Sequence, residues 1–295
     1  MMLSYFLITV IILSNAANSI LSKRFQLSVK NDFSTMLYLN LINAAFGTVY
    51  FLFICKFRIQ MNVVTLMYSL LYAAIVVNSV IVSVVALSKM SMPVYSIIYL
   101  TGSVFGSAFF GRMFFDEKIT LYTALAMVCL FLAVIIPFLG SKEIKYGKKS
   151  FLVMLWTFVL SAVSSVVLKF YTSNPNTYHA NNMFFMTNAN CLVICAGYIA
   201  AIRIIAKKKS EFSLVALNGK QIANIGFRTA VSNIGSILSV LVIAEMDISL
   251  YTIITSSLGL VASALISRFM FCENMGCKNY ISIFLALVAI VLTAI

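Results

Sequence analysis

The stretch VYSIIYLTGSVFGSAFFGRMFFDE (residues 94–117) recurs in altered form as LYTIITSSLGLVASALISRFMFCE (residues 250–273), and this recurrence decides the fold. When the chain is shifted by 156 residues against itself, positions 72–117 and 228–273 share 13 identities in 46. The identities include an arginine and a glutamate five residues apart in each copy: Arg112 with Glu117, and Arg268 with Glu273. Two charges that recur in register are hard to obtain from apolar composition alone, so the sequence predicts an internal repeat.

The composition indicates the class of protein. Of 295 residues, 62% are hydrophobic and 10% are charged, and the mean hydropathy is +1.03. A soluble domain is about half apolar and a quarter charged, so this composition excludes one, together with disordered and collagen-like chains. The 21 Lys and Arg residues lie almost entirely in short gaps between apolar runs, where basic residues commonly set membrane orientation. We therefore expect an integral, multi-pass membrane protein whose partner is the lipid bilayer, with no nucleic acid bound.

The apolar runs divide into ten segments of membrane-spanning length. A transmembrane helix needs about 20 mostly apolar residues. Helices are expected at residues 2–22, 34–55, 62–87, 91–115, 120–140, 150–170, 182–202, 221–244, 247–271 and 279–295. The polar gaps between these runs are too short to hold a soluble domain.

The repeat divides these ten helices into two copies. A weaker similarity between NAANSILSK (15–23) and SAVSSVVLK (161–169) extends the repeat toward the first helix. Residues 1–140 and 141–295 are therefore expected to be two five-helix repeats. Because five is odd, the second copy enters the membrane in the opposite orientation. The predicted fold class is an all-α membrane protein with ten transmembrane helices in two inverted repeats, which places a substrate site near the bilayer midplane between the halves.

The repeat and its motif resemble a known family. A small-residue-rich fourth helix that runs through an aromatic residue into glutamate (GRMFFDE and SRFMFCE) is similar to the drug/metabolite transporter (DMT) superfamily, in its EamA-like branch. The resemblance covers essentially the whole chain and implies transport with a central cavity to which the fourth and ninth helices contribute. That superfamily includes metabolite and amino-acid exporters, nucleotide-sugar and triose-phosphate exchangers, and drug pumps. Asp116 and Cys272 stand where the family usually has glycine, which weakens any subfamily assignment.

Polar side chains within the apolar helices mark the candidate binding site, because they are expensive in hydrocarbon and usually face a bundle interior or a cavity. The candidates are Asn15, Asn18, Asn78, Tyr95, Tyr99, Asn233, Tyr251 and Thr255. A tyrosine offers a flat apolar wall and a hydroxyl group, which suits a pocket for an organic solute. The alternatives are hydrogen bonds between helices for the amides and interfacial anchoring for Tyr95 and Tyr251. We predict that six of them point into one central cavity between the halves: Asn15, Asn18, Asn78, Asn233, Tyr95 and Tyr251.

The charges bear on the substrate. All eight acidic residues fall at helix ends or in loops, which disfavours proton-coupled export of quaternary cations at a buried carboxylate. Three basic residues do approach the hydrocarbon: Lys23, Lys169 and Arg228. They either snorkel to the interface or attract an anionic or zwitterionic substrate. A cavity with these groups nearby is predicted to prefer such solutes to monovalent cations.

Several features of the helix ends and packing faces have two interpretations. The Arg112 and Glu117 pair and its copy could form an exchangeable gate, but a fixed cap on the turn is favoured. Small residues in the fourth and ninth helices are expected to permit close packing; they are Gly102, Gly106, Ser107, Gly111, Gly259, Ala262, Ser263 and Ser267. Four cysteines within apolar runs are interpreted as packing residues. Cys272 and Cys277 could pair only if their loop faces an oxidising compartment.

The orientation of the chain in the membrane has conflicting indications. With Arg228 left out, the odd-numbered connections between helices hold 15 Lys and Arg residues and the even-numbered ones hold 5. The positive-inside rule then places both termini outside the cytoplasm. The family resemblance implies that both termini lie in the cytoplasm.

The function expected from these patterns is secondary transport of a small polar organic metabolite, zwitterionic or anionic, by alternating access at the plasma membrane. The chain lacks a GxxxxGK[ST] phosphate loop and has one histidine, so no ATP site, metal, cofactor or enzymatic activity is predicted. The alternatives are a multidrug or organic-cation exporter of the same superfamily, and a membrane scaffold or sensor that does not transport. A monomer or a homodimer is expected.

Overall fold

The computed structural model describes residues 2–26, 33–87, 92–136, 148–177, 179–205, 218–270 and 277–294, and within these ranges it contains helices and short connections but no strand. All ten predicted helices are present. They are α1 (Met2–Gln26), α2 (Phe33–Ile54), α3 (Val63–Leu87), α4 (Met92–Phe115), α5 (Leu121–Ile135), α6 (Lys148–Ser173), α7 (Ala180–Ile205), α8 (Gly219–Glu245), α9 (Ile248–Met270) and α10 (Cys277–Ala294). The protein is therefore all-α, and the apolar runs predicted the helix bounds to within a few residues, apart from the end of α5.

The lengths and surfaces of the helices indicate a membrane protein. Five helices contain segments long and apolar enough to cross a bilayer: Leu37–Ile54, Val63–Val82, Leu152–Ser173, Ala180–Ala201 and Gly219–Glu245. Large apolar side chains lie exposed on the outside of the bundle, among them Phe109, Trp156, Val193, Phe227 and Phe284. In water, so much exposed apolar area would be unfavourable, whereas lipid covers it without cost.

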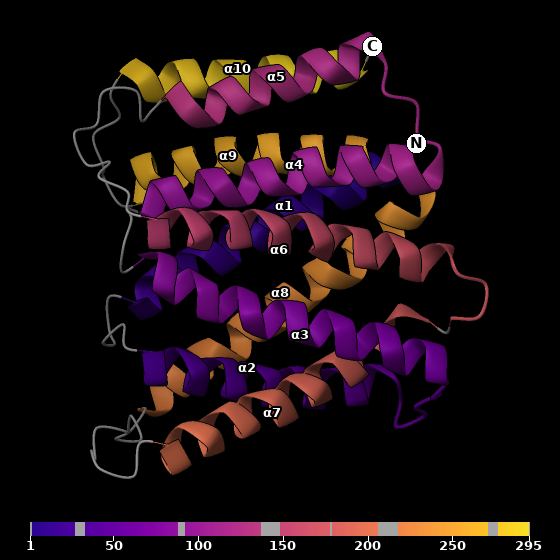
Figure 1. Cartoon of the computed structure of the whole chain (residues 1–295), viewed down its shortest axis with the longest axis vertical. Helices are drawn as coiled ribbons and strands as arrows, with labels where there is room; N and C mark the ends of the chain where they lie inside the picture. Colours follow the sequence, from indigo (N-terminus) through magenta and orange to yellow (C-terminus); the bar gives the residue numbers. More distant parts are fainter. Residues whose placement is uncertain are drawn as a thin grey trace.

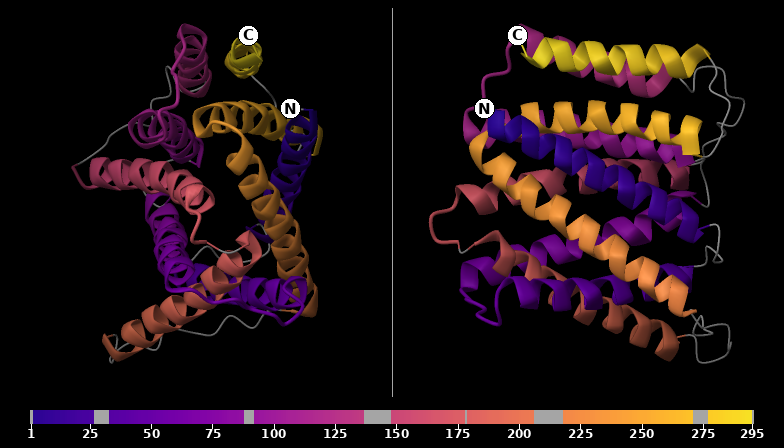
Figure 2. Two further views of the ribbon diagram at one scale, coloured as in Figure 1. Left: turned by 90° about the vertical axis from the view of Figure 1, so that its right-hand side faces the viewer. Right: turned by 180° about the vertical axis from the view of Figure 1, so that it is seen from behind.

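The helices lie roughly side by side, and consecutive helices run antiparallel (Figure 1). As a result, α1 begins and α10 ends at the same end of the bundle, together with the turns at residues 55–62, 116–120 and 246–247. We call this the terminal end. The helices α5 and α10 form an outer pair beside α4 and α9, as Figure 2 shows from two further sides.

Contacts between helices follow a regular exchange between the two halves of the chain. The helix α1 packs against α8 and α9, and α6 packs in the same manner against α3 and α4. The other large contacts are α2 with α7, α5 with α10, α3 with α7 and α9 with α10, followed by α4 with α9 and α2 with α8. When five is added to or subtracted from each helix number, one contacting pair becomes another contacting pair. For example, α1 with α8 becomes α6 with α3. Most contacts therefore join the two halves rather than helices within one half.

The helices α4 and α6 approach each other at backbone distance. A Cβ atom added to Gly102 would lie 2.5 Å from the carbonyl oxygen of Phe158, and one added to Gly106 would lie 2.2 Å from the Cβ of Ala162. Both pairs are separated by four residues, so one face of each helix meets the other at backbone distance. The predicted close packing is confirmed here. At Gly259 in α9 it is wrong, because no described atom lies within 4 Å of the added Cβ.

The largest apolar cluster lies toward the terminal end. It combines Ile8 and Ile11 of α1, Phe51 of α2, Tyr171 of α6, Phe184 of α7 and Tyr251 of α9 with residues near the end of α8. The rings of Phe51 and Phe184 stack with centroids 5.5 Å apart. Because six helices from both halves contribute, the interior of the bundle is packed with apolar side chains at this end.

Candidate functional site

Lys169, near the end of α6, binds the turn between α8 and α9. Its Nζ atom donates hydrogen bonds of 2.8 Å each to the carbonyl oxygens of Ile243 and Met246. The last carbonyls of a helix carry partial negative charge and have no partner within the helix, so a lysine ammonium stabilises them. The same Nζ lies 5.9 Å from the ring centroid of Phe115. The structure therefore gives Lys169 a structural contact, and its predicted role in substrate binding stays a prediction.

Glu117 binds the other side of the same turn. Its carboxylate accepts hydrogen bonds from the backbone N–H of Ile248 (2.6 Å) and from the backbone N–H (3.2 Å) and hydroxyl (2.7 Å) of Ser249. These donors belong to the first turn of α9, where the helix dipole favours a negative charge. The side chain is only 5% exposed. Glu117 of the first half therefore caps a helix of the second half.

The backbone after α4 turns sharply to place this carboxylate. Asp116 has a positive φ of 51°, and the Glu117 N–H donates to the carbonyl oxygen of Gly111. A Cβ on Gly111 would lie 2.5 Å from the Glu117 Oε2 atom, so only glycine leaves room for the carboxylate. An asparagine, aspartate or glycine tolerates such a φ best, so Asp116 is well suited to this turn.

The predicted ion pair between Arg112 and Glu117 is not formed. Both Glu117 oxygens bind α9, and Arg112 is exposed, with no ion pair to any residue that the structure describes. The five-residue spacing suggested a local pair, but the buried backbone N–H groups of α9 are stronger competitors, since they have no other acceptor. Glu117 does act as a cap, as favoured from the sequence. Its partners, however, are the backbone N–H groups and the hydroxyl at the start of α9 rather than Arg112. Glu273, in the second copy, lies outside the described residues.

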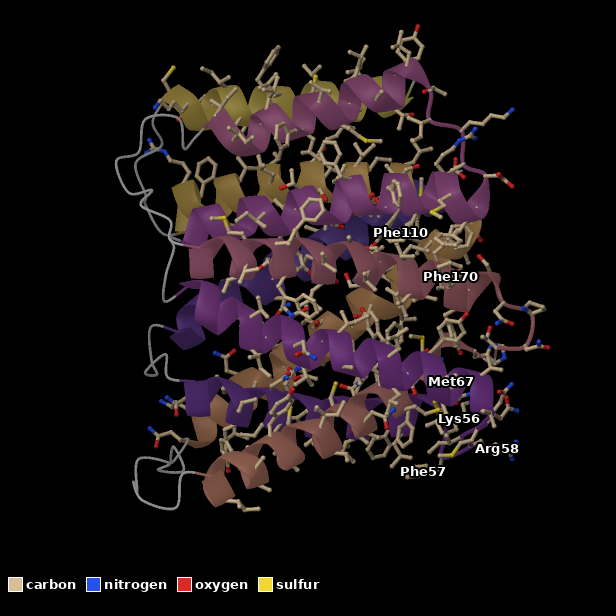
Figure 3. The ribbon with its side chains drawn as sticks, viewed as in Figure 1. Lys56, Phe57, Arg58, Met67, Phe110 and Phe170 are labelled. Atoms are coloured by element: carbon tan, nitrogen blue, oxygen red, sulfur yellow. The ribbon has the colours of Figure 1, made fainter. Side chains whose placement is uncertain are left out.

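Aromatic rings surround the Lys169 contact. Phe170 packs against Phe114 and Phe115, with ring centroids 5.3 Å and 4.9 Å apart, and Phe114 stacks on Phe110. Phe110 and Phe170 are labelled in Figure 3, where α4 and α6 approach the terminal end. This apolar surrounding weakens competition from water for the hydrogen bonds of Lys169.

We expect Lys169→Met to lower the free energy of unfolding by about 1.5–3 kcal/mol, because two hydrogen bonds from a charged donor are lost. Chemical unfolding of the purified protein in detergent, followed by circular dichroism, measures the change. Lys118→Met, at an exposed lysine in the connection from α4 to α5, is the matched control and should leave the midpoint unchanged. Equal midpoints for both variants would contradict a structural role for Lys169.

Two predicted site residues, Asn18 and Arg228, are brought into direct contact. The Nε atom of Arg228 on α8 donates a 2.9 Å hydrogen bond to Oδ1 of Asn18 on α1, although the residues are 210 positions apart. About two turns further along α8, Gly235 lies beside α1, where an added Cβ would be 3.4 Å from the Ser14 Cβ and 3.8 Å from the Asn15 Oδ1, at ordinary contact distance. Asn15 and Asn18 therefore both line the contact between α1 and α8.

The other predicted amides do not join this contact. The Nδ2 atom of Asn78 donates to the carbonyl oxygen of Ala74 in its own helix, at 2.8 Å. The Nδ2 atom of Asn233 is buried and has no hydrogen-bond partner among the described residues. A buried amide without a partner costs free energy, so Asn233 is a position where a solute or water would find a donor.

The predicted aromatic candidates lie in different surroundings. Tyr99 is 37% exposed, whereas Tyr251 is 8% exposed and belongs to the apolar cluster at the terminal end. The hydroxyl of Thr255 donates to the carbonyl oxygen of Tyr251, within α9. The side chains of Lys23 and Tyr95 lie outside the described part of the chain. Among the predicted site residues that the structure describes, Asn18 and Arg228 are joined by a hydrogen bond, and Asn15 lies at the contact of the same two helices.

Sequence reasoning missed a group of asparagines on α2 and α7. Thr229 follows Arg228 directly in the chain, and its hydroxyl donates a 2.6 Å hydrogen bond to Oδ1 of Asn43. Further contacts join Asn40 to Cys195, Asn190 to Ser69 and Asn182 to Cys55. The segments NLINAA and NNMFFMTNAN, within α2 and α7, carried the pattern that could have revealed them. These contacts hold α2, α3, α7 and α8 together through polar groups.

Comparisons with known proteins agree with this fold and add no activity. No family model and no curated protein matches the chain, whereas 28 chains of known structure match its fold. One crystal structure superposes with a TM-score of 0.69 over 98% of this chain and 95% of that chain, at 10% sequence identity. At such low identity the likeness shows the fold alone. The chain is thus a helical protein with the composition of a membrane protein, in a ten-helix fold that other solved proteins share.

Proposed function

We propose that this protein is a secondary membrane transporter for a small polar organic metabolite, related to the EamA-like branch of the drug/metabolite transporter superfamily. In this proposal all ten helices span the membrane, residues 1–140 and 141–295 are inverted repeats, and rocking of the halves exposes a central site to each side in turn. The plasma membrane is the proposed location.

The observation that carries the proposal is the polar contact between Arg228 and Asn18, which joins the two halves of the chain where α8 packs against α1. Ionisable groups at membrane depth are rare and usually mark a path for a solute or ion. A scaffold gains nothing from such a group, because apolar packing would hold α1 against α8 at lower cost.

The pattern of helix contacts also supports the proposal. Replacing each helix by its counterpart five positions along converts the contacts of α1 with α8 and α9 into those of α6 with α3 and α4. The same helices pair in both halves, although the extents of the contacts differ, as expected if the halves can exchange between two related arrangements in alternating access. The apolar cluster at the terminal end and the close approach of α4 to α6 would belong to one of these arrangements.

Flux in proteoliposomes tests this function. The purified full chain is reconstituted, and uptake of labelled amino acids, dicarboxylates, sugar phosphates, nucleotide sugars and organic cations is measured with and without the same unlabelled solute inside. We expect saturable uptake of a solute subset that accelerates with internal solute, since exchange avoids the return of an empty carrier. Protein-free vesicles are the control. Absence of protein-dependent flux for every class would favour the scaffold or sensor alternative.

A further inference from the structure

Arg228 lies deep within α8. It is the tenth residue of a helix of 27 residues, so it lies roughly 14 Å from the helix start and well inside a hydrocarbon layer of about 30 Å. Its partner Asn18 lies about 12 Å from the end of the antiparallel α1, which ends at Gln26. The hydrogen bond to Asn18 therefore holds the guanidinium at membrane depth instead of letting it extend to the interface.

Only one side of the guanidinium is used. Its Nε donates to Asn18, and among the residues that the structure describes, its two terminal amino groups contact no acceptor. These two nitrogen atoms are not fully buried, so they retain some accessible surface. A guanidinium has five N–H donors in a rigid fork, and the pair of parallel donors on its open side matches the two oxygens of a carboxylate.

No acidic side chain of the described part compensates this charge. Its four acidic residues, Asp116, Glu117, Glu245 and Asp247, all lie at the terminal end. The nearest of them along α8 is Glu245, about 25 Å from Arg228 along the helix axis. Lys169, the other described cation predicted for the site, is held at the turn between α8 and α9 by two carbonyl oxygens. Within the described part of the chain, Arg228 is thus a positive charge that no acidic side chain compensates, and it is separate from the Lys169 contact.

The direction of Arg228 follows from the faces of α8. Phe227, Ile234 and Leu241, spaced by seven residues, are exposed and form the face toward lipid. Arg228 lies about 100° around the helix from this face, on the side where Gly235 meets α1. Its successor Thr229 points to Asn43 of α2. The guanidinium therefore lies where α1 and α8 meet, with hydroxyl and amide groups on the neighbouring positions.

We propose that Arg228 binds the carboxylate of the transported solute through its two terminal amino groups, and that Asn18 acts as a positioning residue that orients the guanidinium through Nε. This inference rests on the proposed function and gives it a substrate class: small organic acids, including zwitterionic amino acids. In a site of low dielectric, an unpaired guanidinium attracts an anion strongly and repels cations. Lys169 takes no part in the binding.

Matched acids and amides test the proposal on the full chain in detergent. Thermal-shift titrations use glutamate with glutamine, alanine with alaninamide, and succinate with succinamide as probes, with glucose 6-phosphate and tetraethylammonium as the phosphate and the cation. A ligand that binds only the folded state raises the melting temperature, and the stabilisation grows with the logarithm of the ligand concentration divided by its Kd, so titrations rank the affinities. The proteins compared are the wild type, Arg228→Gln, Arg228→Lys, Asn18→Ala, Lys169→Gln and the exposed-site control Arg58→Gln.

We expect at least one acid to bind the wild type roughly tenfold or more tightly than its amide, as one charge-assisted contact would give. Arg228→Gln should abolish this preference, and Arg228→Lys should reduce it because lysine cannot form two parallel bonds. Asn18→Ala, which keeps the guanidinium, should weaken binding severalfold while the acid stays preferred. Lys169→Gln and Arg58→Gln should keep the wild-type preference.

Several results would overturn the proposal. Equal binding of acids and amides to the wild type would overturn it. Tighter binding of glucose 6-phosphate or tetraethylammonium than of any acid would also overturn it. A third such result is loss of the acid preference in Lys169→Gln but not in the Arg228 variants. If Arg228→Gln fails to fold, the Arg228→Lys and Asn18→Ala results decide. Flux of a neutral or cationic solute in proteoliposomes without acid binding would sink this inference and leave transport standing. Absence of both flux and binding would sink both.

Discussion

Gly106→Leu should prevent the chain from reaching its folded state. The first carbon of any side chain at this position would lie 2.2 Å from the Cβ of Ala162 and 2.7 Å from its Cα. The Ala162 atoms belong to or adjoin the backbone of α6, so no rotamer change can relieve the clash. Gly102 meets Phe158 in the same way one turn earlier. Ordinary overpacking costs 1–3 kcal/mol, and separating two helix backbones should cost more than about 3 kcal/mol.

Size-exclusion chromatography and chemical unfolding in detergent measure this loss. Gly259→Leu is the matched control, because Gly259 lies on the repeat-related helix α9 and a Cβ there meets no described atom within 4 Å. We expect a monodisperse, stable Gly259→Leu protein and an aggregated or absent Gly106→Leu protein. Gly106→Ala should be intermediate. If Gly106→Leu and Gly259→Leu were equally stable, the close approach of α4 and α6 would be wrong.

The helices were predictable because the bilayer imposes a simple rule. Each apolar run must reach about 20 residues and end at polar gaps, so the bounds of α3 and α4 follow from the sequence to within one residue. The small residues of the fourth helix also gave the correct packing role for Gly102 and Gly106. The same pattern failed at Gly259, because a small residue permits close contact but does not require a neighbour to be there.

The polar contacts were predictable only in part. Asn18 and Arg228 each stood out as costly residues in apolar segments, but nothing in either segment indicates the other, 210 residues away. Their contact depends on how α1 packs against α8, which is a property of the whole bundle. Asn43 was not among the predicted residues, and its partner Thr229 lies 186 positions away on another helix, so nothing in either segment indicates the contact.

The roles of Lys169 and Glu117 were missed for a different reason. Both residues bind backbone groups at helix ends, and a backbone N–H or carbonyl leaves no trace in residue identity. From the sequence, Glu117 was therefore considered with Arg112, five residues away, and Lys169 was placed either at the membrane interface or near an anionic substrate. Their actual partners in the turn between α8 and α9 are explained by the unsatisfied groups at every helix end.

Glu117→Ala should give the second large loss of stability. The substitution leaves the N–H groups of Ile248 and Ser249 and the Ser249 hydroxyl without their charged acceptor, in a site that is almost fully buried. Each buried donor left unsatisfied costs about 1–3 kcal/mol, and the costs are not fully additive, so we expect a total near 3 kcal/mol. Glu117→Gln keeps one acceptor oxygen and should lose about half as much.

Chemical unfolding in detergent measures both variants against Asp116→Asn, which changes the net charge equally at the adjacent exposed residue. We expect Asp116→Asn to unfold close to the wild-type midpoint, because Asn also tolerates a positive φ. A double variant with Lys169→Met should lose less than the sum of the single losses, since both side chains hold the same turn and its release removes both contacts at once. If the two losses add fully in the double variant, Glu117 and Lys169 stabilise α9 and α8 independently. If Glu117→Ala alone leaves the unfolding midpoint unchanged, the carboxylate does not cap α9.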